Sequence, residues 1–249
     1  MKAIIPAAGY ATRLYPITEC TPKALLDVGE KKMLEHVIEK IEELGVVDEI
    51  IIVSNAKFFP QFMEWKKAYK PKVPVRVLND GTLSIETRLG AIGDYHFAIK
   101  KLKINDDVLF VSSDNLFNFD LKPMHEHFCS CGNDVIALYD VGCAEEAKKM
   151  GIAEIDEEKK VIGFVEKPPV PKSTLCSIGI YLYTKDTVNL FEKYLEEGNS
   201  PDKPGEFIVW LHKRKHVSAF IFDAPQHKWY DIGTPEILEK VRKEFCGQK

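Results

Sequence analysis

The chain has 249 residues, of which 45% are hydrophobic and 29% charged, enough apolar material for a large core. Its 34 basic and 38 acidic side chains give a net charge of −4, which disfavours a general nucleic-acid coat. No apolar run approaches the ~18 residues of a membrane span, no apolar signal segment follows Met1, and the scattered cysteines suggest no zinc set. We therefore expect no nucleic-acid partner, no membrane span and a reducing, cytoplasmic location.

The first half of the chain alternates apolar runs with segments of helical periodicity. The expected strands are residues 3–6, 49–54, 73–78 and 108–112. The expected helices are residues 33–44, 58–69 and 84–101, with Thr82 or Ser84 capping the third. Continuous apolar strands between helices predict an α/β fold with a mostly parallel, twisted sheet and helices on both faces.

The second half adds antiparallel features. Residues 152–155 and 161–165 predict a hairpin across a charged turn at 157–159. Further strands are expected at 134–139, 176–183, 217–222 and 229–232. Further helices are expected at 121–129, 144–150, 186–197, 205–214 and 235–245. No repeat or low-complexity linker divides the chain, so we expect one domain over residues 1–249.

The stretch from Lys2 to Lys23 is the feature around which the chain is organised. A short buried strand leads into the small-residue turn at 7–11, and the cations Arg13 and Lys23 follow. Such a turn lets backbone N–H groups approach an anion, so the stretch predicts a phosphate-binding loop. It lacks the spacing of G-x-G-x-x-G and of a Walker A loop, which disfavours a dinucleotide-dependent oxidoreductase.

Ligands of open α/β sheets bind beyond the carboxyl ends of the strands. The loops expected there begin at Ala7, Asn79, Ser113, Glu166 and Asp231. Asp114, in S-S-D-N, ends a buried strand, and a carboxylate in this place suits Mg²⁺, which takes a few carboxylates together with phosphate oxygens. An Asp at a strand end also has purely structural uses, so this residue alone does not decide the function.

The segment P-A-A-G-Y-A-T-R-L-Y-P-I-T-E-C-T-P-K-A-L-L resembles the signature of the sugar-phosphate nucleotidyltransferases, such as glucose-1-phosphate thymidylyl- and uridylyltransferases. The resemblance implies their Rossmann-like nucleotide-diphospho-sugar transferase fold. It also implies that Ala8, Gly9 and Thr12 wrap a nucleoside triphosphate. Arg13 would hold the departing pyrophosphate, and Lys23 would neutralise charge at the α-phosphate.

Other segments match the same family. Asp231, in K-W-Y-D-I-G-T-P-E, looks like its second metal carboxylate beside Asp114, which implies a Mg²⁺ site. The segment E-K-P implies that Glu166 accepts hydrogen bonds from sugar hydroxyls and that Lys167 contacts the phosphate of a sugar 1-phosphate. Matches in M-G-I-A-E and C-S-I-G-I-Y imply that the same pocket is lined by Gly151, Ser177 and Gly179.

The sequence does not decide which base the nucleotide carries. The resemblance implies that the turn after residue 78 reads the base, through Asn79, Gly81 and Thr82. The glutamine usual in thymidylyltransferases is missing shortly after Gly81, so base preference is unsettled. An ordinary helix-capping turn is the structural alternative for these residues.

The expected activity is transfer of a nucleotidyl group from a nucleoside triphosphate, with dTTP or UTP favoured, to a sugar 1-phosphate. In-line attack at the α-phosphate would release pyrophosphate. One alternative is a CTP-dependent cytidylyltransferase acting on a sugar phosphate or phosphocholine. Another is a catalytically inactive regulatory relative that binds nucleotide-sugar, which the presence of every expected catalytic residue disfavours. The chain stops after its last expected helix, so we expect no C-terminal β-helix domain; a homo-oligomer and allosteric regulation stay open.

Overall fold

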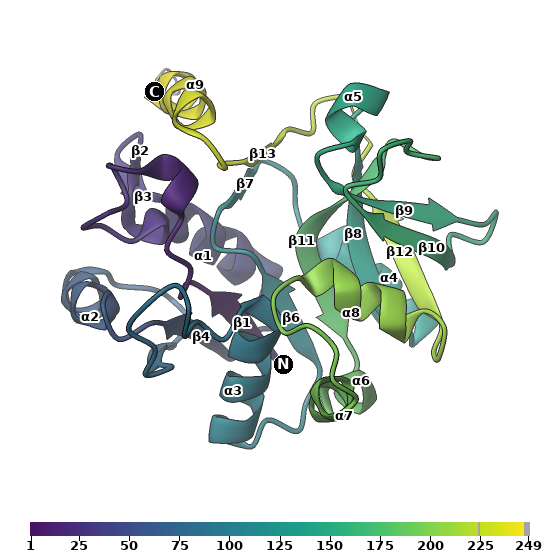
Figure 1. The fold of residues 1–249 in the computed structure, drawn as a ribbon, viewed down its shortest axis with the longest axis horizontal. Coiled ribbons are helices and arrows are strands. Elements are labelled where there is room, and N and C mark those ends of the chain that lie inside the picture. Colours follow the sequence, from purple (N-terminus) through teal and green to yellow (C-terminus); the bar gives the residue numbers. More distant parts are fainter. Residues whose placement is uncertain (224, 247–249) are drawn as a thin grey trace.

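A nine-stranded mixed sheet organises the computed structural model, which describes residues 1–223 and 225–246 (Figure 1). Its parallel part runs in the order β6-β1-β4-β5, with β1 paired to both β6 and β4. These strands are β1 (Lys2–Pro6), β4 (Glu49–Ser54), β5 (Val75–Asn79) and β6 (Val108–Val111). Their apolar side chains are almost fully buried, as expected for strands covered on both faces.

The second part of the sheet is largely antiparallel and is joined to the first through β11, which pairs with β6. Its strands are β8 (Asp134–Asp140), β9 (Gly151–Ile155), β10 (Val161–Glu166), β11 (Leu175–Tyr183) and β12 (Val217–Ile221). β9 and β10 form the predicted hairpin, and β12 runs parallel to β8. Two small sheets lie outside it: β2 (Asp27–Val28) with β3 (Lys31–Lys32), and β7 (Asn115–Phe117) with β13 (Trp229–Asp231).

Helices cover both faces of the sheet, and each face has its own apolar cluster. One cluster includes α1 (Met33–Leu44), α2 (Phe59–Ala68) and α4 (Lys122–Cys131). The other includes α3 (Ala91–Leu102), α7 (Leu190–Glu196) and α8 (Pro204–Leu211), which lie on the near side in Figure 1. The remaining short helices are α5 (Ala144–Ala147) and α6 (Lys185–Val188). The predicted α/β class with helices on both faces is confirmed.

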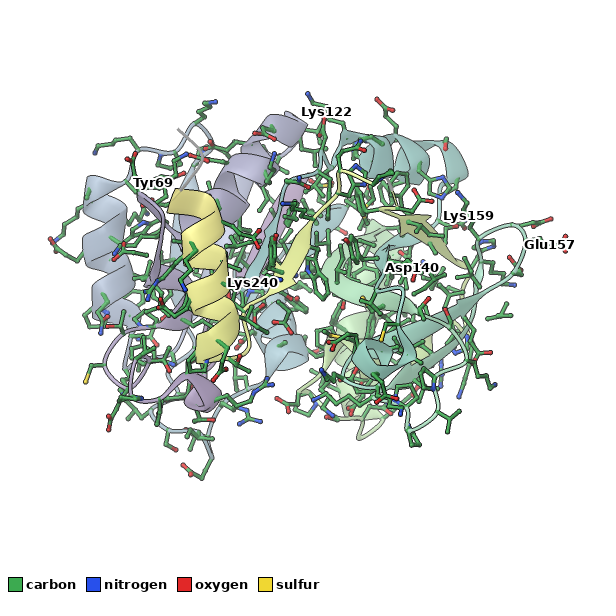
Figure 2. The ribbon with its side chains drawn as sticks, turned by 90° about the horizontal axis from the view of Figure 1, so that it is seen from above. Tyr69, Lys122, Asp140, Glu157, Lys159 and Lys240 are labelled. Atoms are coloured by element: carbon green, nitrogen blue, oxygen red, sulfur yellow. The ribbon has the colours of Figure 1, made fainter. Side chains whose placement is uncertain are left out.

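The last helix closes the fold over the N-terminal part of the chain. α9 (Pro235–Cys246) follows β13, and its Leu238 and Val241 are fully buried in a third cluster with Val28 and Met33. Figure 2, seen from above, shows α9 lying over the N-terminal segments. None of the helices in the described residues is long and apolar enough to cross a membrane.

Two predicted helices differ from the structure. The helix expected over 84–101 begins only at Ala91, so neither Thr82 nor Ser84 caps it. The reason is local: the Thr87 hydroxyl donates to the Ser84 carbonyl, which makes a turn, and Gly90 adopts a φ of +79° that cannot continue a helix. The helix expected over 186–197 is divided at Asn189 into α6 and α7.

Candidate active site

The small-residue loop after β1 is fixed by its neighbours. The Asn55 side-chain amide donates to the Ala8 carbonyl at 2.8 Å, and the Thr18 hydroxyl donates to the Ala11 carbonyl at 2.8 Å. Ala11 has a left-handed φ of +47°, which directs the chain into the short 3-10 helix Thr12–Leu14. At Gly9 no atom lies within 4 Å of the place where a Cβ would be. The loop is therefore rigid, and its backbone at Gly9 is open to a ligand.

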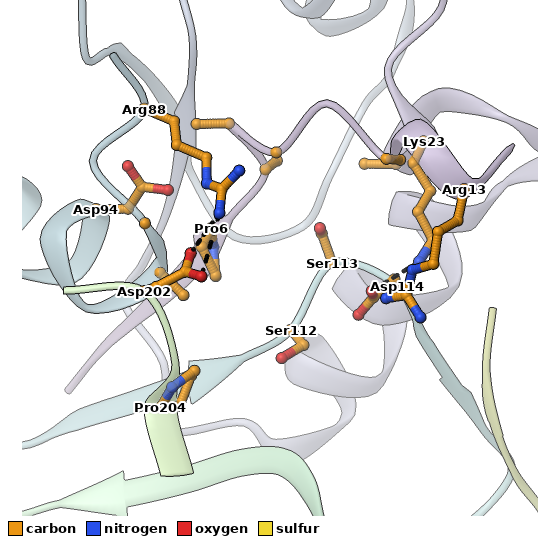
Figure 3. A pocket seen from close by; sticks show the side chains of 17 residues that line it. Pro6, Arg13, Lys23, Arg88, Asp94, Ser112, Ser113, Asp114, Asp202 and Pro204 are labelled. Carbon is orange, nitrogen blue, oxygen red and sulfur yellow. Dashed lines mark hydrogen bonds and ion pairs between the residues drawn. The ribbon is translucent and has the colours of Figure 1, made fainter. Parts of the chain in front are cut away.

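This loop forms one wall of a cavity of about 440 Å³ (Figure 3). The opposite walls come from the start of α3, the end of β6 and the segment before α8. The predicted residues that line it are Ala8, Gly9, Arg13, Lys23 and Asp114. Arg13 and Lys23 lie at one end, beside Asp114, as Figure 3 shows. A cationic end next to exposed backbone is suited to a chain of phosphates.

Asp114 and Asp231 lie close enough to interact electrostatically. Lys23 donates to the Asp114 carboxylate at 2.7 Å, with 14% and 34% of their side chains exposed. β7 and β13 bring the second carboxylate close, since the N–H of Ile232 donates to the Asp114 carbonyl at 3.3 Å. Burial raises the pKa of Asp231, the Asp114 carboxylate raises it further, and Lys23, Arg13 and Lys167 oppose this. Two acids that repel each other among cations are a plausible place for a divalent ion.

A second cavity, of about 380 Å³, lies on the other side of this pair. The predicted residues that line it are Gly151, Glu166, Lys167, Ser177, Gly179 and Asp231, together with Arg13 and Asp114. A Cβ on Gly151 would come within 2.9 Å of the Glu166 carboxylate, and a Cβ on Gly179 would meet the Asn115 amide at 2.9 Å. Both glycines are therefore required for close approach rather than only for strand geometry.

The two cavities adjoin each other and share part of their lining. Both are lined by Arg13, Ser112, Asp114, Asp202 and Pro204. Lys167 enters the second cavity from a strained backbone, with a φ of +49°, and its N–H donates to the Met150 carbonyl at 2.9 Å. Non-glycine residues in this conformation persist where the surroundings impose it, which is common at functional sites. A ligand in each cavity would place its reacting end beside Asp114.

The turn expected to read the base lies outside both linings, as does Thr12. The Gly81 N–H donates to the Asn79 side chain at 2.8 Å, and the Thr82 N–H and hydroxyl donate to the Asp80 carboxylate. These contacts make a closed turn whose polar groups satisfy one another. The roles of Asn79, Gly81, Thr82 and Thr12 in nucleotide binding stay predictions.

Four residues at the other end of the first cavity were not predicted from the sequence: Arg88, Gly90, Asp94 and Asp202. Arg88 and Asp202 form an ion pair at 3.2 Å, and the Pro201 and Asp202 carbonyls accept the first N–H groups of α3. The overlooked signal was Gly90 and Gly93 inside a supposedly continuous helix, because such glycines often mark a helix start or a close approach. A Cβ on Gly90 would lie 2.5 Å from the Pro201 carbonyl.

A magnesium ion fits the residues present. Within the described residues no three His, Cys, Asp or Glu side chains gather as a metal site, so a metal would have only Asp114 and Asp231 as protein carboxylates. Mg²⁺ tolerates this, because it keeps waters and takes phosphate oxygens from its substrates. Burial is the main cause of the raised pKa of Asp231 and the Asp114 carboxylate adds to it, and a bound cation would offset both effects.

An open α/β sheet whose strand ends carry an anion-binding loop, two cations and two adjacent carboxylates defines a nucleotide-binding fold built for phosphate chemistry. The comparison with known families gives the particular group. The family model described as nucleotidyl transferase matches residues 2–247, and the chain belongs to that family. The resemblance in the opening segment is thereby confirmed.

Among characterised relatives, the bifunctional protein GlmU of Methanocaldococcus jannaschii is 29% identical over 256 residues, covering 100% of this chain and 57% of that protein. Mannose-1-phosphate guanylyltransferase 1 of Arabidopsis thaliana is 32% identical over 255 residues, covering 98% of this chain and 66% of that protein. The chain thus spans between about half and two thirds of the length of these relatives.

Solved structures share the fold. A putative glucose-1-phosphate thymidylyltransferase from Bacillus anthracis superposes with a TM-score of 0.85 at 24% identity, covering 100% of this chain and 96% of that one. A UDP-glucose pyrophosphorylase in complex with UDP-glucose superposes with a TM-score of 0.81 at 24% identity, covering 100% and 99%. These similarities establish the Rossmann-like nucleotidyltransferase fold for this chain.

Proposed function

We propose that the protein transfers a nucleotidyl group from a nucleoside triphosphate to a sugar 1-phosphate and releases pyrophosphate. The observation that carries the proposal is the position of Asp114, which lies in the lining of both cavities and is paired with Lys23. One cavity has the loop and cations that a triphosphate needs. The other has the acid and lysine that a sugar phosphate needs, and the two ligands would meet beside Asp114.

In this reaction an oxygen of the sugar phosphate attacks the α-phosphorus. A new P–O bond forms as the bond from that phosphorus to the β-phosphate oxygen breaks, and pyrophosphate leaves with the electron pair. Lys23 stabilises negative charge at the α-phosphate, and Arg13 binds the leaving pyrophosphate. Lys167 binds the attacking phosphate and Glu166 accepts hydrogen bonds from sugar hydroxyls, so both substrates are oriented before the step. The attacking phosphate is already ionised at neutral pH, so no general base is required.

Asp114 and Asp231 would hold Mg²⁺ in this proposal. When bound, the metal would neutralise charge on phosphate oxygens of the two substrates. Lys23 contacts Asp114 at 2.7 Å, so it orients one of these carboxylates as well as meeting the phosphate. The two acids repel each other, so occupation of the site by a cation should lower the pKa of Asp231.

The finer choice of substrates is open in the comparisons. The resemblance in the opening segment favours dTTP or UTP, whereas relatives of similar identity are named mannose-1-phosphate guanylyltransferases. CTP with a sugar phosphate or phosphocholine is the alternative. The proposal also includes a single domain over residues 1–249, small molecules as partners and a cytoplasmic location.

The test is a pyrophosphate-release assay with purified protein and Mg²⁺. Each of GTP, CTP, UTP, dTTP and ATP is combined with glucose 1-phosphate, mannose 1-phosphate, N-acetylglucosamine 1-phosphate or phosphocholine. We expect release that needs both substrates and the metal, and that chelation of the metal abolishes. If triphosphates bind but no combination gives product, the catalytic proposal fails and a regulatory, nucleotide-binding role takes its place.

A further inference from the structure

The end of the first cavity opposite the cations contains a buried carboxylate. Asp94 lies in the first turn of α3, and 4% of its surface is exposed. Figure 3 shows it beside Arg88 and Asp202, across the cavity from Arg13 and Lys23. With the phosphates at the cationic end, the opposite end is where a nucleotide has its base.

The carboxylate of Asp94 has no hydrogen-bond partner among the described residues, and its Oδ1 is fully buried. Burying a carboxyl group without a partner is costly, and natural proteins retain such groups mainly where a ligand or water completes them. Burial, and secondarily the Asp80 carboxylate, raises the pKa of Asp94 to about 8. The surrounding chain therefore places an unsatisfied acid in the cavity and does nothing to stabilise its charge.

The backbone donors at this end are occupied, whereas the side chain of Arg88 keeps donors that a base could use. The Ala91 N–H donates to the Asp202 carbonyl at 3.1 Å, and the Ile92 N–H donates to the Pro201 carbonyl at 2.9 Å. The Arg88 guanidinium contacts the Asp202 carboxylate through Nη2 alone, so its Nε–H and Nη1–H groups can donate to a carbonyl oxygen of a base. Asp94 has no hydrogen-bond partner in the described part of the chain and is an acceptor when ionised, so this end suits a base that presents donors to Asp94 beside a carbonyl oxygen for Arg88.

We propose that Asp94 is the specificity-determining residue of the nucleotide cavity and that it selects guanine. This inference rests on the proposed function, because it assumes that a nucleoside triphosphate occupies the cavity. Guanine presents N1–H and the 2-amino group side by side, and the two oxygens of one carboxylate accept from both. Uracil and thymine present a single N–H between two carbonyl oxygens, which the carboxylate repels.

Adenine and cytosine fit less well for a related reason. Each has one amino group next to a ring nitrogen that accepts, so an ionised carboxylate gains one hydrogen bond and meets one lone pair. A protonated Asp94 would suit cytosine, by donating to its N3 and accepting from its amino group. With a pKa of about 8, Asp94 carries its proton at neutral pH in the free protein, so binding of guanine must release that proton; two donated hydrogen bonds favour the release, because they lower the pKa of the acid that accepts them.

Calorimetric binding of GTP, ITP, CTP and UTP in the presence of Mg²⁺ tests this choice. ITP differs from GTP by the missing 2-amino group, so it removes one of the two hydrogen bonds. We expect GTP to bind the unchanged protein about 10-fold or more tighter than ITP, and about 10- to 100-fold tighter than UTP, the range for hydrogen bonds to a charged group. In Asp94→Asn, whose amide opposes the 2-amino group, GTP and ITP should become equal within about 3-fold.

Two further variants separate this role from a merely structural one. Asp94→Ala should also lose the preference for GTP over ITP, while its melting curve reports whether it folds. Asp80→Asn is the matched control, because Asp80 neighbours Asp94 but lies outside the cavity lining, and it should keep the preference. Two results would overturn the inference and leave the proposed function intact. One is tighter binding of CTP or UTP than of GTP, and the other is a preference for GTP over ITP that persists in Asp94→Ala. Absence of binding by every triphosphate overturns the proposed function with it.

Discussion

The two cavities meet at Asp114 but are built in different ways. The nucleotide cavity uses the carboxyl ends of parallel strands, and most of its predicted residues come from one continuous stretch, residues 7–24. The acceptor cavity draws its residues from the β9–β10 hairpin, β11 and β13, which are far apart in the chain. The loop of the first is held by side chains that donate to its backbone carbonyls, and the second depends on glycines that leave room for neighbouring side chains.

Both cavities contain a non-glycine residue whose backbone φ lies in the left-handed region. Ala11 adopts this conformation where the loop turns toward Arg13, and Lys167 adopts it where the β9–β10 hairpin ends. Each costs on the order of 1 kcal/mol and is held by its surroundings. The difference in construction implies that changes in one half should leave binding to the other half intact, unless they touch the shared carboxylates.

The largest effect on activity is expected at Asp114, where the two cavities meet. Asp114→Asn removes a metal carboxylate and the partner of Lys23, so turnover should fall by roughly 10³-fold, the scale for losing a pre-organised charge at a phosphoryl centre. Pyrophosphate release under saturating substrates measures it. The exposed Asp223→Asn is the control and should keep full activity. Turnover within 3-fold of the unchanged protein would exclude Asp114 as a metal ligand.

The difference between the halves also explains what the sequence could predict. The loop with Arg13 and Lys23 is local, so its residues and their chemistry are visible as one pattern. The fold class follows from apolar strands between amphipathic helices. Glu166 and Lys167 form an ordinary tripeptide with the proline that follows, and only the resemblance to a family gave them a role.

The cavity end formed by Gly90 and Asp94 was not predicted, because the start of the helix was inferred from neighbouring residues alone. Ser84 and Thr82 are good helix caps, yet the helix begins at Ala91, directly after Gly90. The close contact of Gly90 with Pro201 depends on a segment more than 100 residues away. No periodicity within residues 84–101 contains that contact. Asp94 was consequently assigned to a helix interior, where a buried acid has no evident purpose.

Asp94 should make the free energy of unfolding of the protein depend on pH. Its pKa is raised from the ordinary value near 4 to about 8, so the folded state keeps the proton that the unfolded chain loses. The stability that this group contributes is fully present below about pH 4 and is lost as the pH rises to about 8. Its total is on the order of 3 kcal/mol, since water in the cavity lessens the penalty of burial.

Urea unfolding of the unchanged protein and Asp94→Asn at pH 5, 7 and 9 measures this. The difference in free energy of unfolding should shift in favour of the variant as the pH rises, because Asn carries no titrating proton. Arg88 and Asp202 are common to both proteins, so their own contributions cancel, while the repulsion between Asp80 and ionised Asp94 is part of the difference that is measured. A difference that stays constant across the three pH values would show that Asp94 titrates normally.

Two glycines with similar φ angles should separate the turn predicted to read the base from the cavity end proposed for it. Gly90→Ala introduces a Cβ 2.5 Å from the Pro201 carbonyl at a φ of +79°, so it should cost about 2–3 kcal/mol and weaken triphosphate binding. Gly81→Ala has a φ of +83° but open space, so it should cost only about 1 kcal/mol. Thermal unfolding and calorimetry measure both effects. A larger loss of nucleotide affinity in Gly81→Ala would restore the turn at Asn79 as the base site.

The smallest effect is expected in the acceptor half. Lys167→Met removes a cation that is largely exposed, so the KM for the sugar phosphate should rise about 10-fold, while triphosphate affinity changes less than 2-fold. Lys172→Met is the control, because Lys172 is an exposed lysine outside the cavity lining.

Lys167→Gly separates charge from backbone strain at the same position. Glycine accepts a φ of +49° without penalty, so this variant should be more stable than Lys167→Met by about 1 kcal/mol. It lacks the cation, so its KM for the sugar phosphate should be raised as in Lys167→Met. If Lys167→Gly instead restores the original KM, the backbone conformation at residue 167, and not the ammonium group, orients the sugar phosphate. Both cavities would then position their ligands through a residue with a left-handed backbone conformation.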